Sequence, residues 1–149
     1  MPDRGLKGAR PRVKPMDTYT LVRPEHLNHY GYLFGGAMLR WVDETAWLTA
    51  SRQFPGCRLL TVGMDRIQFR HPVQNGSILR FRIVHARQGR TSATYTVDVF
   101  ADAPGARAEQ HVFATHVTFV RVDARGRKRA LPPAIEVPTA AEPSKDRTK

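Results

Sequence analysis

One helix-like segment, with strand-like segments on both sides of it, decides which architectures this chain can adopt. From Gly36 to about Gln53 no proline intervenes, and apolar residues recur at steps of three and four positions, as on one face of an α-helix. The recurring residues are Ala37, Met38, Trp41, Val42, Thr45, Ala46, Leu48 and Thr49. At 1.5 Å per residue the predicted helix is roughly 26 Å long. Further apolar residues off this stripe, such as Trp47, predict that the helix is covered on more than one side.

The other regular segments are typical of β-strands. Residues 77–87 and 91–100 alternate apolar and polar side chains with a period of two, and turn residues precede both segments. The predicted strands span residues 18–22, 58–69, 77–87, 91–100 and 108–122. Because no second helix or sheet is available to bury the helix, we expect an α+β protein in which an antiparallel sheet curves around it. The exposed edges of such a sheet favour pairing with a second copy of the chain.

The net charge of +11 lies mostly near the two ends of the 149-residue chain. Residues 1–15 carry a net +4 and residues 124–149 another +4, so residues 16–123 carry only +3. Pro- and charge-rich ends of this kind are typical of disordered segments. We therefore predict a basic tail over 1–15, one domain over 16–132 and a second tail over the remaining residues, 133–149. The weak charge of the domain argues against nucleic acid as the partner and suits a polyanionic small ligand such as a nucleotide thioester.

Several classes of protein are excluded by residue types and runs that the sequence lacks. No stretch of 18 or more apolar residues occurs, which predicts no transmembrane span, and residues 1–15 lack the apolar core of a secretory signal. A cytoplasmic location is therefore expected. Cys57 is the only cysteine, which excludes an intramolecular disulfide and a cysteine-rich zinc site. A histidine metal site is not expected either, because strand alternation places His111 and His116 on opposite faces, and Val112 on the same face as His116.

The segment 28–44, NHYGYLFGGAMLRWVDE, carries the candidate chemistry. Gly35 and Gly36 at the predicted helix start allow a ligand to approach the backbone, where the free N–H groups of the first turn carry the positive end of the helix dipole. A carbonyl oxygen placed there would be stabilised as it gains negative charge. Asp43 follows Gly36 by seven residues, about two helical turns, and a carboxylate on an otherwise apolar helix needs water or a partner.

The motif around this helix start resembles that of a known family. The pattern N-x-x-G-x-x-F-G-G-x6-D is matched by Asn28, Gly31, Phe34, Gly35, Gly36 and Asp43, and it is similar to that of the hotdog-fold acyl-CoA thioesterases. The most similar branch holds the bacterial short- and medium-chain acyl-CoA hydrolases and the cytosolic brain-type acyl-CoA hydrolases. Further matches follow in order at residues 41–44, 61–62, 69–73, 89–92 and 129–132, so the resemblance covers residues 16–132. Phe34, where some relatives have His, and His71 before Pro72 are departures from the pattern.

This resemblance implies a fold, a reaction and a set of roles. The fold is the hotdog fold, a five-stranded antiparallel sheet wrapped around one long central helix, which agrees with the element order above. The active sites would lie between two protomers, and dimers would assemble further into tetramers or hexamers. Asp43 would be the general base or nucleophile, Asn28 of the other protomer would position water or thioester, and the N–H of Gly36 would form the oxyanion hole. Hydrolysis of acyl-CoA to CoA and a carboxylic acid needs no cofactor or metal, because a thioester carbonyl is already activated.

The expected CoA-binding element is the predicted turn at Gly89, Arg90, Thr91 and Ser92. This turn offers backbone N–H groups, two hydroxyls and one guanidinium for pantetheine and phosphates, and an ordinary hairpin turn is the alternative interpretation. Gly35 is expected beside the thioester. Arg129, in a basic run that would otherwise be merely solvated, is expected at the phosphates of the nucleotide. The acyl pocket is expected at the dimer interface, where Phe34, Trp41, Trp47 and Phe54 would shape it.

Other interpretations of the same residues remain open. Asp43 could be a surface residue paired with Arg40 or Arg52, the two glycines could form a plain turn, and Asn28 could cap a loop. A second enzyme class is dehydration of a hydroxyacyl thioester, for which His29 would be the catalytic histidine. A different class is a non-catalytic acyl-CoA sensor or a nucleic-acid binder that uses its tails, and the latter would lose binding steeply as salt rises.

Overall fold

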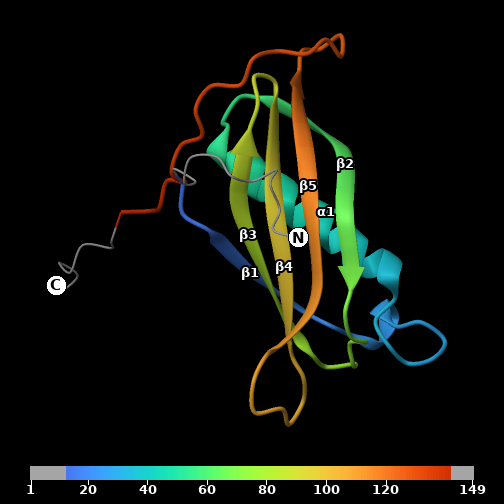
Figure 1. Ribbon diagram of the computed structural model, residues 1–149. Helices are drawn as coiled ribbons and strands as arrows, with labels where there is room; N and C mark the ends of the chain where they lie inside the picture. Colours follow the sequence, from blue (N-terminus) through green and yellow to red (C-terminus); the bar gives the residue numbers. More distant parts are fainter. Residues whose placement is uncertain (1–12, 142–149) are drawn as a thin grey trace, which may run out of the picture.

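One long helix and five strands make up the regular structure of residues 13–141, the part of the chain that this computed structural model describes (Figure 1). The elements in order are β1 (Met16–Leu21), the 3-10 helix η2 (Pro24–His26), α1 (Gly35–Gln53), β2 (Arg58–Phe69), β3 (Ile78–Gln88), β4 (Ser92–Asp102) and β5 (Gln110–Val122). The strands form one sheet in the order β1-β3-β4-β5-β2, and all four neighbouring pairs are antiparallel. The helix and all five strands begin and end within two residues of their predicted bounds.

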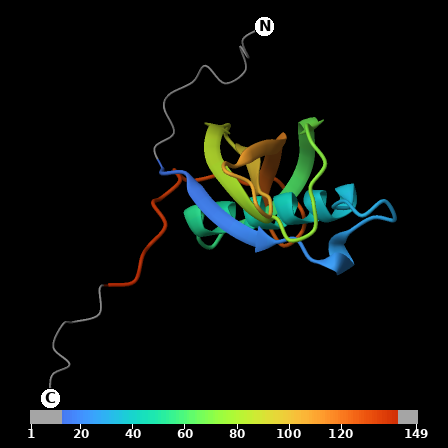
Figure 2. The same cartoon turned by 90° about the horizontal axis from the view of Figure 1, so that it is seen from below.

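The sheet curves around α1, as Figure 2 shows in the view along the molecule. The helix buries the side that faces the sheet, where small residues such as Ala46 and Ala50 allow a close approach. The facing strands contribute large buried side chains, each of which stabilises the fold by about 1.5–3 kcal/mol; the largest are Tyr95, Phe81, Phe113, Phe119, Leu79 and Ile83. The opposite side of the helix is open, since Trp47 and Leu48 are 41% and 49% exposed. The prediction that the helix is covered on more than one side is therefore wrong for a single chain.

A β-bulge at Val112 changes which side chains of β5 face the core. The register of the pairing between β4 and β5 shifts here, and Val112 and Phe113 are both buried although they are consecutive. The predicted alternation put Val112 on the outer face, which is wrong because a bulge inserts one extra residue into the period of two. For the same reason His111 and His116 lie on the same face, and not on opposite faces as expected. Their ring nitrogens lie 2.8 Å and 3.7 Å from the carboxylates of Asp98 and Asp65, respectively.

The chain after β5 returns across the end of α1. The N–H of Leu131 donates to the carbonyl of Arg90 over 2.8 Å, and the N–H of Ile135 donates to the carbonyl of Gln53 over 2.9 Å. The second bond supplies a donor to the Gln53 carbonyl, which lies in the last helical turn and has no N–H partner within the helix. Residues 133–141 of the predicted tail form neither helix nor strand, and residues 1–12 and 142–149 lie outside the described part of the chain. Within residues 13–141, no helix combines the length and the apolar character that a membrane crossing requires.

Candidate active site

The start of α1 presents two backbone donors. Phe34 precedes the helix without a side-chain cap, and its carbonyl accepts the N–H groups of Ala37 and Met38 at 3.0 Å and 3.3 Å. The N–H groups of Gly35 and Gly36 have no acceptor within the described residues. Unpaired donors of a first helical turn carry the positive end of the helix dipole. This part of the protein can therefore stabilise a negatively charged oxygen, as the sequence predicts.

The ring of Phe34 explains why residue 36 is a glycine. A Cβ atom at Gly36 would lie 2.6 Å from Cε1 of Phe34, closer than two carbon atoms approach without displacement. A Cβ atom at Gly35 would make only an ordinary contact of 3.5 Å with the ring of Phe69. The two glycines thus differ, because only Gly36 allows the Phe34 ring to lie over the helix start. The ring itself is 58% exposed.

Asp43 is held by a hydroxyl of the neighbouring strand. Thr61 of β2 donates from Oγ1 to Oδ1 of Asp43 over 2.7 Å, and the carboxylate is half-buried. The alternative pairing with Arg40 or Arg52 is not among the ion pairs of residues 13–141. Sequence analysis did not assign a site role to Thr61, although it lies in a matched segment. The signal that could have found it is a hydroxyl residue on a predicted strand next to a helix carboxylate in need of a partner.

Asn28 organises the loop that leads to the helix. Its side-chain Oδ1 accepts the backbone N–H groups of Tyr30 and Tyr32 at 2.9 Å and 3.1 Å, and its own N–H donates to the carbonyl of Tyr32. The loop-cap interpretation is therefore correct for Oδ1. The side-chain amide nitrogen has no partner within the described residues, and it is the part of Asn28 that can still donate to a ligand. His29, the candidate for dehydration, stacks on Tyr30 in the same loop with ring centroids 4.0 Å apart.

The groups above do not converge within one chain. Seven residues of helix separate the backbone of Gly36 from that of Asp43 by about 10 Å along the axis. A single thioester carbonyl cannot be held by the Gly36 N–H and attacked with help from the Asp43 carboxylate at that separation, because each contact requires about 3 Å. The turn between β3 and β4, at residues 89–92, lies near the other end of the helix (Figure 1).

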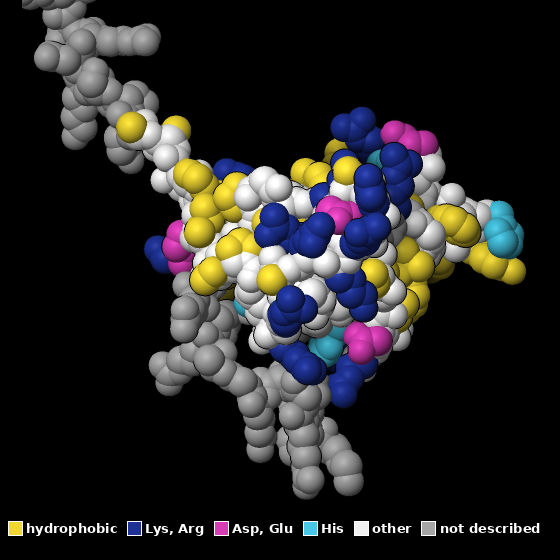
Figure 3. Space-filling view, turned by 90° about the horizontal axis from the view of Figure 1, so that it is seen from above, with side chains coloured by type: hydrophobic (Ala, Val, Ile, Leu, Met, Phe, Trp, Pro, Cys, Tyr) yellow, Lys and Arg dark blue, Asp and Glu magenta, His cyan; other side chains and the backbone are white. Residues whose placement is uncertain are grey.

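The end of the molecule that holds this turn is rich in cations. Figure 3 shows Lys and Arg side chains gathered over it. Arg129 donates from Nη2 to Oδ2 of Asp123 over 2.8 Å, and Arg90 is exposed. The backbone N–H of Arg127, together with the N–H of Arg125 and the Arg129 guanidinium, keeps the pKa of Asp123 below its ordinary value. Arg129 is thus partly neutralised, whereas Arg90 is available to an anion.

The turn itself is held by backbone hydrogen bonds. The N–H of Gly89 donates to the carbonyl of Ser92 over 2.8 Å, and the carbonyl of Thr91 accepts the N–H of Arg121. The first bond closes the hairpin turn between β3 and β4, and the second joins the residue before β4 to β5. A turn with an exposed guanidinium is compatible with phosphate binding.

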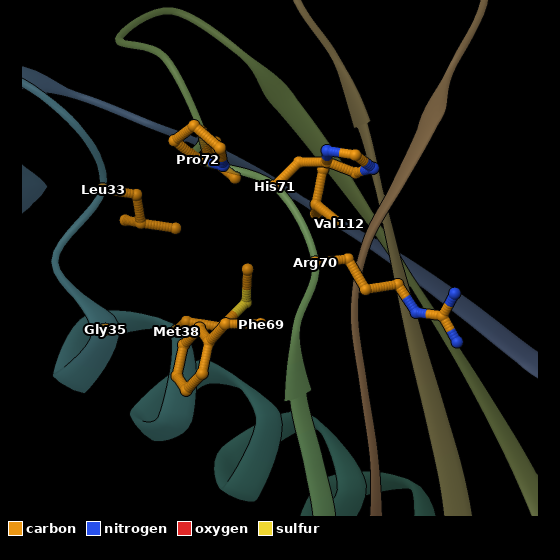
Figure 4. A pocket seen from close by; sticks show the side chains of 9 residues that line it. Leu33, Gly35, Met38, Phe69, Arg70, His71, Pro72 and Val112 are labelled. Atoms are coloured by element: carbon orange, nitrogen blue, oxygen red, sulfur yellow. The ribbon is translucent and has the colours of Figure 1, made fainter.

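A cavity of about 220 Å³ lies beside the start of α1 (Figure 4). Its lining comprises Leu33, Gly35, Met38, Phe69, Arg70, His71, Pro72, Val73 and Val112. The four residues expected to shape an acyl pocket do not line it. Phe54 is fully buried, Trp41 packs edge-on against His26 and Phe81, and the Trp47 indole donates to the carbonyl of Leu59 on the open side of the helix.

Comparison with known proteins places the chain in a family. The model of the thioesterase superfamily matches residues 30–108. An uncharacterized acyl-CoA thioester hydrolase of Zymomonas mobilis is 32% identical over 122 residues, which cover 78% of this chain and 77% of that protein. Mouse acyl-coenzyme A thioesterase 11 is 33% identical over 100 residues, 67% of this chain, but the match spans only 17% of the mouse protein.

Solved structures show the same architecture. An acyl-CoA hydrolase from Bacillus cereus is similar with a TM-score of 0.74 and 27% identity, over 82% of this chain and 74% of that one. A hexameric hotdog fold thioesterase of Campylobacter jejuni is similar with a TM-score of 0.69 and 29% identity, over 77% of this chain and 88% of that one. The predicted hotdog fold is confirmed.

Proposed function

The chain belongs to the thioesterase superfamily, and we propose that it hydrolyses acyl-CoA to free CoA and a carboxylic acid. The observation that carries this proposal is the half-buried Asp43 carboxylate, fixed by the Thr61 hydroxyl at 2.7 Å beside an uncovered sheet edge. A half-buried carboxylate loses part of its hydration, and the hydrogen bond from Thr61 offsets part of that cost. The Zymomonas mobilis and Bacillus cereus relatives are named as acyl-CoA hydrolases, which supports the same reaction.

The N–H groups of Gly35 and Gly36 are proposed to form the oxyanion hole. When a nucleophile adds to the thioester carbonyl, the oxygen gains negative charge and accepts these donors at the positive end of the helix. Their lack of acceptors within the described residues supports the proposal, because no bond has to be broken when substrate enters. Asn28, through its free side-chain amide, is proposed to donate to the attacking water or to the substrate.

Asp43 is proposed to activate water or to attack the carbonyl itself. In the first route Asp43 accepts a proton from water, the hydroxide adds to the carbonyl carbon, and the C–S bond breaks as CoA thiolate leaves and is then protonated. In the second route the carboxylate displaces CoA thiolate and water hydrolyses the resulting anhydride. Thr61 is proposed as a positioning residue, since its bond to Oδ1 leaves Oδ2 for the reaction. Neither route requires a metal ion or a cofactor.

A dimer is proposed as the smallest active unit. β2 is an edge strand, and all its residues except Leu59 and Met64 are exposed. The strand exposes the apolar side chains Leu60, Val62, Ile67 and Phe69, and the helix exposes Trp47 and Leu48. A second copy that covers this surface would bring Gly36 and Asn28 of one chain near Asp43 of the other. Further assembly into tetramers or hexamers is proposed on the example of the hexameric Campylobacter jejuni protein.

The CoA moiety is proposed to bind at the cation-rich end of the molecule. The turn of Gly89, Arg90, Thr91 and Ser92 would hold pantetheine and phosphates, with Arg90 as the main cation. Arg129 would contribute through the N–H groups that do not face Asp123, since a guanidinium has five donors.

The test is thiol release from a series of acyl-CoAs, with wild type beside Asp43→Ala and Asn28→Ala. Asp43→Ala is expected to lower kcat by at least 100-fold, because it removes the group that acts on the reacting water or carbonyl. Glu44→Ala is the matched control, since Glu44 is the exposed neighbour on the same helix, and it should stay within about twofold of wild type. A wild type that binds acyl-CoA without turnover would contradict the proposal and favour the sensor interpretation.

A further inference from the structure

The cavity beside the helix start has a size that fits a short hydrocarbon chain. Its volume is about 220 Å³. Pockets for drug-sized ligands measure about 300–1,000 Å³, whereas an apolar cavity of about 150 Å³ accepts benzene. By this scale the cavity holds roughly six to nine carbon atoms. We propose that this cavity is the acyl pocket and that it limits the substrate to chains of about eight carbons or fewer. Leu33 and Met38 set this limit, and the proposal rests on the proposed function.

The position of the cavity connects it to the reacting carbonyl. Gly35 both lines the cavity and carries one of the free N–H groups of the first helical turn. An oxyanion bound to these N–H groups places the carbonyl carbon at the mouth of the cavity, since a hydrogen bond spans about 3 Å. The two substituents of that carbon then diverge, with the sulfur toward solvent and the acyl chain toward the cavity.

The lining selects an apolar occupant. Leu33, Met38 and Val112 surround the hollow in Figure 4, whereas the side chains of Arg70 and His71 point away from it. A hydrogen bond from Nη2 of Arg70 to Oε1 of Gln68 over 2.9 Å holds the Arg70 side chain in this direction. Because no charged side chain of the lining points inward, burial of an acyl chain in the cavity is favourable. Each methylene that enters raises the affinity by up to about fourfold.

The floor of the cavity sets the length limit. Met38, Val73 and Val112 are 3%, 5% and 1% exposed, and all three belong to the main hydrophobic core of the described chain. At this end of the cavity a longer chain can extend only by displacing these packed side chains, which costs more than the added methylenes contribute. Leu33 lies at the partly exposed side, where its size can change without opening the core.

The experiment measures kcat/KM for acetyl-, butyryl-, hexanoyl-, octanoyl-, decanoyl- and palmitoyl-CoA below their micellar concentrations. Wild type is expected to be most active at eight carbons or fewer and at least tenfold less active at decanoyl-CoA. Leu33→Trp should lower the hexanoyl-to-acetyl ratio by about tenfold because the indole fills the cavity. Leu33→Ala and Met38→Ala should raise the decanoyl-to-butyryl ratio several-fold. Leu39→Ala is the control, since Leu39 is partly buried on the same helix but does not line the cavity.

The outcomes separate this proposal from the one on which it rests. If wild type prefers palmitoyl-CoA, or if both Leu33 variants keep the wild-type chain-length profile, the pocket assignment is overturned while hydrolase activity stands. If wild type hydrolyses no acyl-CoA of the series, the hydrolase proposal fails and the acyl pocket fails with it. The Leu33 variants keep the test decisive even if Met38→Ala does not fold.

Discussion

At the scale of single residues, one hydroxyl fixes the carboxylate on which the proposed chemistry depends. Thr61 reaches from the edge strand β2 to the helix and donates to Asp43 over 2.7 Å. A hydrogen bond to a charged group is worth about 1.5–3 kcal/mol, so the loss of this hydroxyl would release Asp43 to other rotamers. We therefore propose that Thr61 positions the Asp43 carboxylate and does not contact the reacting atoms.

Replacement of Thr61 tests this role. Thr61→Val keeps the shape of the side chain and removes the donor, and we expect kcat to fall by about 10- to 100-fold with KM changed less than threefold. Thr61→Ser keeps the hydroxyl and should restore at least a third of wild-type kcat. Steady-state kinetics with the preferred acyl-CoA provide the measurement. Equal losses in the Val and Ser variants would mean that the methyl group, and not the hydrogen bond, matters.

At the scale of elements, β2 is one of the two edge strands of the sheet, and it is the one beside Asp43. It pairs only with β5, and its register shifts twice, between Thr61 and Gly63 and between Asp65 and Gln68. Its other edge pairs with no strand within residues 13–141, and the strand exposes apolar side chains, which makes it the natural place for a second copy to bind. The opposite edge, β1, exposes Tyr19 and Leu21 on one face only.

A charge on β2 should separate the protomers. Val62 is 59% exposed, so Val62→Asp costs the single chain little but places a carboxylate in the proposed interface. We expect the particle mass in light scattering to fall to that of one chain, the far-UV circular dichroism spectrum to persist, and thioesterase activity to fall at least 100-fold. Tyr19→Lys on β1 is the control and should remain at least dimeric and active. A monomeric wild type that is fully active would refute the two-chain site.

At the scale of the whole molecule, the segment after β5 ties the end of the chain to the end of the helix. Leu131 and Ala134 pack against the core, and Ile135 donates to the carbonyl of Gln53. Gln53 in turn accepts the buried Tyr95 hydroxyl at its Oε1 over 2.7 Å. Burial raises the pKa of Tyr95, so this hydroxyl stays protonated and keeps donating throughout the neutral range.

The Ile135 bond can be removed without a change in net charge. Ile135→Pro deletes the N–H and leaves the Gln53 carbonyl without this donor, at a cost of about 1–3 kcal/mol. For a chain of this size we expect the melting temperature in differential scanning fluorimetry to fall by about 2–10 °C. Ile135→Ala, which keeps the N–H, should lose less than half as much. Similar losses in the two variants would assign the stability to the side chain instead.

The elements of the fold were predictable because their signals are local. A proline-free run with helical spacing and five strand-like segments each specify their own backbone geometry, and they agree with the structure to within two residues. The bulge at Val112 was not predictable, since no turn residue marks it and it exists to fit β5 against β4. The free N–H groups of Gly35 and Gly36 followed from the helix start itself.

The candidate site divides in the same way. Asp43, Asn28 and the glycine pair stand in one segment of 16 residues, so a sequence pattern can hold them together, and their catalytic roles stay predictions. Thr61 and the cavity lining come from segments far apart in the chain, and only their packing shows that they meet. Trp41 packs on His26 and the Trp47 indole donates to the carbonyl of Leu59, and a role of either residue in a pocket at the dimer interface stays a prediction.

The sequence by itself determined one helix, five strands, and a helix start with free donors followed by a carboxylate, since each depends on residues close along the chain. Only the tertiary structure decided which strand became the uncovered edge, which hydroxyl holds Asp43, and where a cavity remains beside Gly35. These features depend on how side chains from distant segments fill space around α1. Packing of that kind is a property of the whole arrangement, and no local pattern encodes it.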